Sequence, residues 1–287
     1  MHIRNPVEWS GAQLVGAAQA LGSAYRSLHH IQDRIHTPAP RVRRITAADI
    51  GTALAKGYDD FAAYRSDVLF LCGIYAVAGL VLSRIALRMN LLPMLFPLAA
   101  GFALIGPFAA VGLYEMSRRR EQGAHITWIN AFDVLREPAI GAIAVLGLVL
   151  IALFGAWLGA AWGIYRGTLG PEAPASLTAF LHDTFTTPDG WLMILYGTGT
   201  GLFFAVLALA LSIVSFPLLL DRDVGLDTAI AASFRAVKMN PLPMALWGLT
   251  VTAGLVIGTI PAFIGLIVVL PVLGHATWHL YRALVAR

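Results

Sequence analysis

Long apolar segments alternate with short amphipathic ones along this chain. Six apolar segments approach or exceed the roughly 20 residues that a helix needs to cross a bilayer. They are Asp67–Met89, Leu91–Tyr114, Ala139–Tyr165, Trp191–Leu220, Leu242–Ile260 and Pro261–Tyr281. The pattern predicts an all-α, polytopic membrane protein with six transmembrane helices.

A short amphipathic stretch precedes each pair of apolar segments. The three stretches are Ile45–Arg65, Ile126–Glu137 and Leu226–Asn240, and their apolar residues recur at helical spacing. These residues are Ile50, Leu54, Gly57, Phe61 and Tyr64 in the first stretch, Trp128, Phe132 and Leu135 in the second, and Leu226, Ile230, Phe234 and Val237 in the third. We expect each stretch to form a helix that lies in the headgroup plane with its apolar face toward lipid.

The stretches and the apolar pairs together predict three parallel repeats, each an interfacial helix followed by a transmembrane hairpin. The repeats cover about residues 45–118, 123–222 and 225–282 within one membrane domain, 41–287. Parallel repeats of this kind occur in known membrane folds. The alternative is that any polytopic protein with interfacial helices would show the same pattern.

Prolines occur at corresponding points of these units. Pro138 and Pro241 follow the second and third amphipathic stretches, where the chain should bend from the membrane surface to its interior. Pro107, Pro217 and Pro271 lie toward the ends of the three units. Because a proline inside a helix removes a hydrogen bond and clashes with the preceding turn, we expect Pro217 to kink its helix.

Residues 1–40 stand outside the repeats. Within Pro6–His36, apolar residues follow alternating steps of four and three, which is the heptad pattern of a coiled-coil seam, and Thr37–Pro40 forms a linker. Several glycines weaken this segment as a free helix, so it needs a surface to lie on. We predict an extra N-terminal amphipathic helix over residues 6–36 that contacts a protein partner, a second copy of the chain or the bilayer.

Composition and charge agree with a membrane location. The chain is 58% hydrophobic and 13% charged, whereas soluble domains contain about 25% charged residues. Basic residues collect before the first apolar segment, in alternate loops and after the last segment, whereas the opposite loop, Gly167–Gly190, is mainly acidic. Since cytoplasmic loops hold the excess of Lys and Arg, both termini should be cytoplasmic. The clusters Arg41–Arg44 and Arg118–Arg120 are expected to contact anionic lipid headgroups, so the basic charge does not predict nucleic-acid binding.

Two histidines are the only candidate metal ligands. His275 and His279 are four residues apart on one helical face, which allows them to share a metal ion, whereas a haem would need axial ligands on opposite faces, from different helices. A zinc site needs three or four ligands, however, and no third ligand is evident in the sequence. The other interpretation is that the two rings, with Trp278 and Tyr281, form an interfacial belt that hydrogen-bonds to headgroups or neighbouring helices.

Three further charged residues lie within or at the ends of the apolar segments. Glu115 and Asp221 end the second and fourth segments and are candidates for a proton relay, although Arg118 and Arg222 are near enough to form local ion pairs. Arg84 lies two-thirds of the way along the first segment. Its side chain should either extend to the membrane surface or line a cavity that faces an anionic ligand.

Four phrases of the sequence carry a family resemblance. They are Arg44–Phe61, Gly106–Glu115, Ser215–Arg222 and Leu270–Arg282. Together they resemble a family of bacterial integral membrane proteins catalogued as a domain of unknown function, number 2189, over about residues 41–285. The resemblance implies a six-span protein of the bacterial inner membrane and supplies no activity or ligand.

No catalytic motif accompanies these features, so we predict neither an enzymatic activity nor a cofactor. The expected function is that of a structural or accessory component of a membrane assembly. One alternative is a transporter or channel for a small apolar or lipid-like substrate, with a path near Pro107, Pro217 and Pro271. The other alternative is a haem- or metal-binding membrane protein that uses His275 and His279.

Overall fold

The structure is a computed structural model that describes residues 40–63, 77, 79–81, 84, 91–124, 127–261 and 263–286. The predicted N-terminal helix over residues 6–36 and most of the first apolar segment lie outside the described residues. The described residues form helices joined by short loops, and their only extended pairing is an isolated bridge between Val42 and Val285. The all-α prediction is therefore confirmed for this part of the chain.

The described elements follow one another without a sheet. They are α2 (Ala47–Ala63), η1 (Leu92–Met94), α4 (Leu95–Ala109), α5 (Val111–Glu121), η2 (Trp128–Arg136), α6 (Ile140–Gly167), α7 (Leu177–Thr186), α8 (Pro188–Ser212), α9 (Ser215–Asp221), α10 (Leu226–Met239), α11 (Pro241–Thr259) and α12 (Leu266–Leu284).

Four described segments are long and apolar enough to cross a membrane. They are Leu92–Ala109, Ile140–Gly167, Pro188–Asp221 and Pro241–Thr259, and they match the second to fifth predicted spans. The sixth predicted span corresponds to α12, which is 19 residues long but is not among the four. The second half of α12 carries histidine, tryptophan, tyrosine and arginine, and these residues lower its mean hydropathy.

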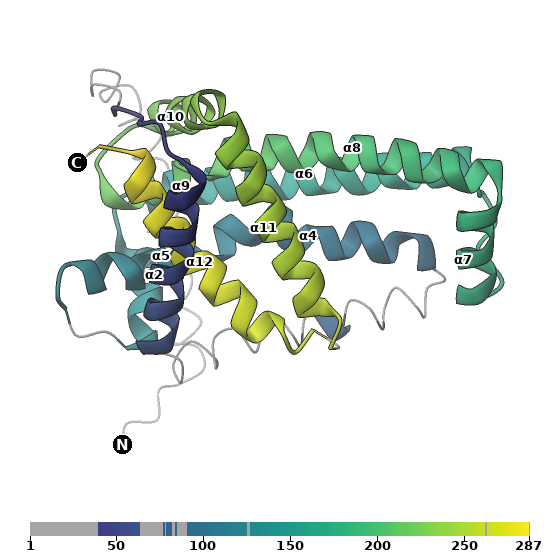
Figure 1. Ribbon diagram of the computed structural model, residues 1–287, viewed down its shortest axis with the longest axis horizontal. Coiled ribbons are helices and arrows are strands. Elements are labelled where there is room, and N and C mark those ends of the chain that lie inside the picture. The colour runs from purple at the N-terminus through teal and green to yellow at the C-terminus, as the bar shows by residue number, and fades with distance from the viewer. Residues whose placement is uncertain are drawn as a thin grey trace, which may run out of the picture.

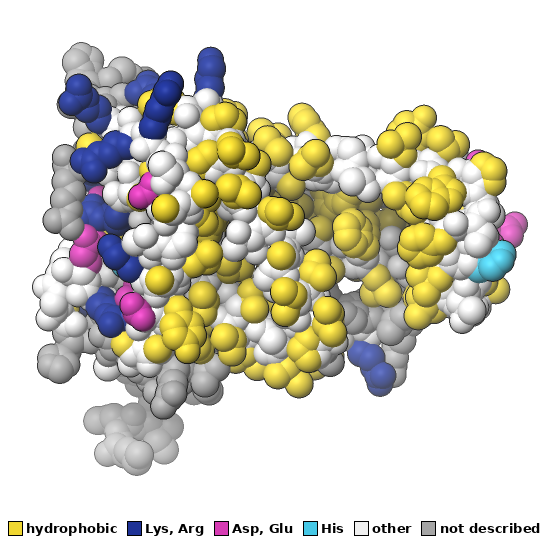
Figure 2. All heavy atoms as spheres, viewed as in Figure 1, with side chains coloured by type: hydrophobic (Ala, Val, Ile, Leu, Met, Phe, Trp, Pro, Cys, Tyr) yellow, Lys and Arg dark blue, Asp and Glu magenta, His cyan; other side chains and the backbone are white. Residues whose placement is uncertain are grey.

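The long helices lie together, and short helices cross them at both ends (Figure 1). Helices α6 and α8 run side by side along the long axis with α4 beside them. At one end lie α2, α5, η2, α9 and α10, and at the opposite end lies α7. We call the first of these the basic end because Lys and Arg side chains gather there, whereas hydrophobic side chains cover the middle of the molecule (Figure 2).

The middle of the molecule exposes an apolar surface of the kind that faces lipid. Large side chains such as Leu148 on α6, Leu202 and Phe203 on α8, and Leu249 and Ile257 on α11 are exposed. A contiguous apolar surface of this size is rare on soluble monomers. The tightest packing lies instead toward the basic end. The largest side chains buried there are Tyr114, Phe216, Trp278 and Tyr281.

The first amphipathic stretch packs against protein, so the prediction that its apolar face contacts lipid is wrong. Helix α2 lies along α12 and buries Ile50, Ala53, Gly57 and Phe61. Contact is closest at Gly57, where a Cβ atom would lie 2.6 Å from the backbone nitrogen of Ala276. The missing side chain therefore allows the two helices to approach.

The other two stretches each pack a face of small or medium side chains against the protein. Helix α10 buries Ala229, Ala232, Ser233 and Ala236, while the larger Phe234 stays exposed. The second stretch forms a 3₁₀ helix, η2, rather than the expected α-helix. It buries Ala131 and Val134 and exposes Phe132 and Leu135. The exposed Phe132, Leu135 and Phe234 all belong to the apolar faces that the sequence predicts to contact lipid.

The predicted kink at Pro217 is confirmed. The fourth apolar segment is interrupted between α8 and α9, at Ile213 and Val214, and Ile213 lies four residues before the proline. A proline cannot donate to the carbonyl four residues earlier, and its ring displaces that carbonyl. Within the interruption, the Val214 amide donates to the hydroxyl of Ser233 at 3.2 Å, which ties the kink to α10. Pro241 occupies the first turn of α11, as expected of a junction proline.

Gly57→Ala should destabilise the protein because its methyl group would meet the α12 backbone, which cannot move aside as a flexible side chain can. We expect a loss of about 1–3 kcal/mol in the free energy of unfolding, measured by denaturant titration in detergent. Gly51→Ala in the same helix is the matched control, because nothing lies within 4 Å of that position. It should be neutral or stabilising by up to about 1 kcal/mol. Equal effects of the two substitutions would contradict the close packing of α2 on α12.

Candidate functional site

Helix α5 carries the polar side chains that connect the elements of the basic end. Glu115, Ser117 and three consecutive arginines, Arg118–Arg120, lie within this one helix. Successive residues of an α-helix point about 100° apart, so consecutive arginines reach different neighbours. Each of the three arginines pairs with a carboxylate from another element.

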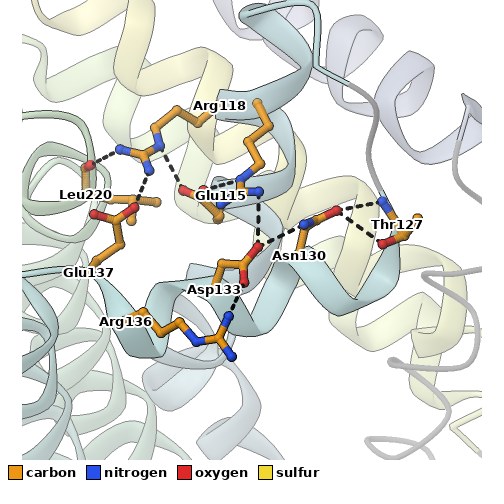
Figure 3. Close-up of polar contacts among 9 residues, drawn as sticks. Glu115, Arg118, Thr127, Asn130, Asp133, Arg136, Glu137 and Leu220 are labelled. Carbon is orange, nitrogen blue, oxygen red and sulfur yellow. Dashed lines mark hydrogen bonds and ion pairs between the residues drawn. The ribbon is translucent and has the colours of Figure 1, made fainter.

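Glu115 is fully buried and lies between two of these arginines (Figure 3). Its Oε1 accepts a hydrogen bond from Arg119 Nε at 2.5 Å. Its Oε2 lies 2.7 Å from Arg118 Nε, as an ion pair without aligned hydrogen-bond geometry. The local ion pairing expected between Glu115 and Arg118 is thus present. A buried carboxylate needs such partners because an unpaired charge in the interior costs several kcal/mol.

Arg118 joins α5 to two other parts of the chain (Figure 3). Its guanidinium donates to the Leu220 carbonyl in α9 at 2.6 Å and to Glu137 Oε1, just before α6, at 2.6 Å. Burial by itself would lower the pKa of Arg118, but hydrogen bonding and attraction from Glu115 and Glu137 raise it above its usual value. The side chain therefore acts as a permanently charged connector.

Arg119 reaches the 3₁₀ helix η2. Its guanidinium lies 3.0 Å from Asp133 Oδ2, which also accepts from the Asn130 amide at 2.8 Å. Asn130 in turn accepts from the Thr127 backbone amide at 2.9 Å and completes a capping box at the start of η2. The Asn130 hydrogen bond and the charges of Arg119 and Arg136 lower the pKa of Asp133.

Arg120 extends the network to α2 through a single buried carboxylate, Asp60. Asp60 Oδ1 accepts from Arg120 at 2.7 Å. Its Oδ2 accepts from the Ser117 hydroxyl at 2.6 Å and pairs with His279 Nε2 at 2.8 Å. One carboxylate on α2 therefore connects α5 and α12. Burial by itself would raise the pKa of Asp60, but the hydrogen bonds from His279 and Ser117 outweigh burial and lower it below 3.8.

These hydrogen bonds also assign the ring protons of both histidines. The Ser117 hydroxyl has one proton, which it donates to Asp60, so it must accept from His275 Nδ1 at 2.8 Å. His279 must carry its proton on Nε2 because its partner there is a carboxylate. The result is a continuous hydrogen-bonded chain from the partly exposed His279 through the buried Asp60 and Ser117 to the buried His275.

The remaining polar residues at the end of α12 also contact protein. The Tyr281 hydroxyl donates to Asp221 Oδ2 at 2.6 Å, and Arg282 donates to the same oxygen at 3.1 Å. Trp278 Nε1 and Arg282 both donate to Glu121 at the end of α5. Because His275, Trp278 and Tyr281 are fully buried, they do not form a belt of headgroup contacts. The part of that hypothesis that predicted hydrogen bonds to neighbouring helices is correct.

A polar groove of about 590 Å³ opens beside Asp60, between α2, α5 and α12. Its lining is mixed in charge and includes Asp49, Lys56, Asp59, Asp60, Arg120, Glu121, His279 and Arg282. Lys56 and Asp59 are exposed, whereas Asp60 lies buried at its edge. The volume of the groove falls within the range of known ligand sites, and its lining is more polar than theirs usually is.

His275 and His279 are the metal ligands that the sequence offered as candidates. Within the described ranges, no group of three or more His, Cys, Asp or Glu side chains is placed to hold a metal. His275 and His279 both contact the Asp60–Ser117 pair, and Ser117, although buried, is among the residues that line the groove. Metal or haem binding at His275 and His279 stays a hypothesis from the sequence.

The structure brings together some of the predicted site residues. Glu115 and Asp221 both lie at the basic end, and Asp221 pairs with Arg222 at 3.6 Å as expected. Arg84 is exposed, and the residues on either side of it lie outside the described ranges. Pro217 and Pro271 are buried within packed helices. Protein carboxylates pair with the guanidinium groups of Arg118–Arg120, whose side chains are 18%, 28% and 35% exposed, and the expected contact of this cluster with lipid headgroups stays a prediction.

Sequence reasoning missed Asp60, Ser117 and Asn240. Asp60 had a usable signal, since it is three residues after Gly57 and beside Phe61, on the buried face of α2. Asn240 is buried at the junction of α10 and α11, where its side chain accepts from the Ile45 amide at 2.8 Å. Its amide donates to the Arg43 carbonyl at 3.0 Å. No local pattern could identify this contact, because it joins residues almost two hundred positions apart.

Residues 95–221 match the model of a family described as a predicted integral membrane protein, DUF2189. The resemblance seen in the sequence is therefore confirmed over α4 to α9, a shorter segment than expected. No curated protein and no solved structure matches the chain. The matched segment contains Glu115, Arg118 and Glu137, whereas α2 and α12 lie outside it. The chain is thus a membrane protein, and the family description assigns it no activity.

Arg118→Lys should destabilise the basic end. A lysine ammonium cannot contact Glu115, Glu137 and the Leu220 carbonyl together, as the planar guanidinium does. We expect a loss of about 1.5–3 kcal/mol in the free energy of unfolding, the usual contribution of hydrogen bonds to charged groups. Arg136→Lys is the control, because the Arg136 side chain is 87% exposed and makes one 3.6 Å ion pair. Equal stability of the two variants in detergent would contradict the connecting role of Arg118.

Acid should also weaken the basic end. Because the pKa of Asp60 is lowered on folding, its carboxylate adds stability that is fully present above the ordinary pKa of 3.8. This stability is lost as the pH falls through the lower pKa of the folded state. We expect the melting temperature in nanodiscs to fall below about pH 4, and Asp60→Asn to show a lower melting temperature at neutral pH and a smaller acid-induced fall. Asp59→Asn, at the exposed neighbour, should behave as the wild type, and an unchanged acid response in Asp60→Asn would contradict this role.

Proposed function

We propose that this protein is a non-catalytic structural or accessory component of a membrane assembly in the bacterial inner membrane. The observation that carries the proposal is the network of ion pairs and hydrogen bonds around α5. It holds α2, η2, α9 and α12 in one rigid polar platform beside an apolar, lipid-facing body. Charges that join helices in this way give the basic end a stable contact surface.

The basic end faces the cytoplasm in this proposal. Exposed Arg43 and Arg44 precede α2, and exposed Arg235 and Lys238 lie on α10. An excess of such residues near the membrane ends of helices favours the cytoplasmic side. The start and the end of the described domain lie together there, because the Arg43 amide donates to the Leu284 carbonyl at 2.7 Å.

Six membrane crossings agree with this geometry. A chain that enters and leaves its membrane domain on the same side must cross an even number of times. The four apolar segments, α12 and the first apolar segment of the sequence together supply six crossings. The order of α10, α11 and α12, a short helix followed by two longer ones, supports the proposed repeat unit.

The groove beside Asp60 and the N-terminal segment over residues 6–36 are the proposed contact elements for a protein partner or a second copy. The groove combines acidic and basic side chains on helices that the network holds in place, which suits a polar protein segment. A transport path receives less support. Pro107, Pro217 and Pro271 line neither this groove nor a smaller apolar cavity between η1 and α6.

A photo-crosslinking amino acid in place of the exposed Lys56 tests this function in native membranes. We expect a discrete adduct that is heavier than the monomer and is weakened by deletion of residues 2–39. The same group in place of Thr178, exposed on α7 at the opposite end, is the control and should give no such adduct. A monomer in mild detergent that is unaffected by the deletion, together with no adduct from position 56, would overturn the proposal.

A further inference from the structure

Helix α7 is a rigid crosswise helix in a segment that the sequence presented only as a loop. Its N-terminus is capped by the Ser176 hydroxyl, which accepts from the Ala179 amide at 3.1 Å. Helix α8 follows directly and is capped by the Thr187 hydroxyl, which accepts from the Gly190 amide at 3.0 Å. A Cβ atom at Gly190 would collide with the carbonyls of Asp183 and Thr184. The two helices are therefore held in a fixed relative position.

The surface of α7 divides into three faces. One face packs against protein through Thr184, which is buried, and through Phe180, whose ring centroid lies 6.4 Å from that of Tyr165. A second face carries only polar side chains. These are Thr178, His182 and Thr186, and all three are exposed.

The third face is an exposed apolar stripe with the i, i+4, i+8 spacing of one helix side. Leu177, Leu181 and Phe185 are 52%, 45% and 57% exposed. Figure 2 shows hydrophobic side chains on the part of this end that faces the middle of the molecule, with histidine and acidic side chains on its outer edge. A helix that exposes both a polar face and an apolar face suits the boundary between an apolar phase and water.

We propose that α7 lies in the membrane interface at the end opposite the basic end, with Leu177, Leu181 and Phe185 inserted among lipid chains. The stripe continues onto the apolar surface of α8, where Trp191 and Leu195 are 58% and 65% exposed. Tryptophan is enriched at membrane–water boundaries, and Trp191 marks that depth. The crosswise direction of α7 relative to α6 and α8 matches a helix in the plane of the interface (Figure 1).

Lipid suits this stripe better than a second copy of the chain does. Three side chains on a ten-residue helix cover far less than the roughly 800 Å² per partner of a stable protein interface. Lipid needs no matching surface, and burial of the stripe would hold the ends of α6 and α8 at a constant depth. The short helices at the basic end and α7 would then define the two boundaries of the membrane.

Site-directed spin labelling tests this placement in the full chain. Cys72 is the only cysteine, so Cys72→Ser provides a background for single labels in phosphatidylcholine–phosphatidylglycerol nanodiscs. Leu181→Cys and His182→Cys place the label on the apolar and polar faces, and Leu195→Cys on α8 serves as the lipid-facing reference. We expect the label at 181 to resemble that at 195, with frequent oxygen and rare nickel-chelate collisions, and the label at 182 to show the reverse.

Two results would overturn the placement. One is nickel accessibility at 181 as high as at 182, which would put the stripe in water. The other is spin–spin broadening at 181 that disappears on dilution with unlabelled protein, which would place a second copy on the stripe. Phe185→Cys lies on the same stripe and repeats the measurement if the label at 181 prevents folding.

Discussion

The buried carboxylate of Glu115 is the constraint on which the arrangement of the basic end depends. An ionised carboxylate in the protein interior is stable only when charged or hydrogen-bonding partners surround it. Arg118 and Arg119 supply those partners, and their remaining donors must then find oxygens on other elements. The Leu220 carbonyl, Glu137 and Asp133 provide those oxygens. The position of one acid on α5 thus restricts where α9, the start of α6 and η2 can lie.

Asp60 applies the same principle to the other side of α5. It accepts from Ser117 and Arg120 on α5 and pairs with His279 on α12. Gly57, one turn earlier on α2, allows the close approach that brings this carboxylate to its partners. Backbone contact and ion pairing therefore support each other. A larger residue at 57 would separate the helices, and a neutral residue at 60 would leave the arginine and histidine without their partner.

The molecule combines two kinds of stabilisation that suit two environments. The middle of the molecule exposes leucine, isoleucine and phenylalanine side chains, for which lipid is a favourable solvent. Such side chains need few specific contacts. At the basic end, charged side chains are satisfied by one another, by a backbone carbonyl or by solvent. Concentrating ion pairs at this end yields a rigid surface on a membrane-embedded body, which is the property expected of an accessory or scaffold component.

The sequence by itself determined the helical class, the membrane location, the helix break before Pro217 and the Glu115–Arg118 pair, because each depends on residues close along the chain. Only the tertiary structure decided which apolar faces are buried against protein and which stay exposed. It also decided that Asp60 contacts His279, 219 residues away, and that part of the Gly167–Gly190 loop forms α7. The reason is physical. An amphipathic pattern shows only that one face avoids water, and both lipid chains and packed side chains satisfy that requirement equally well.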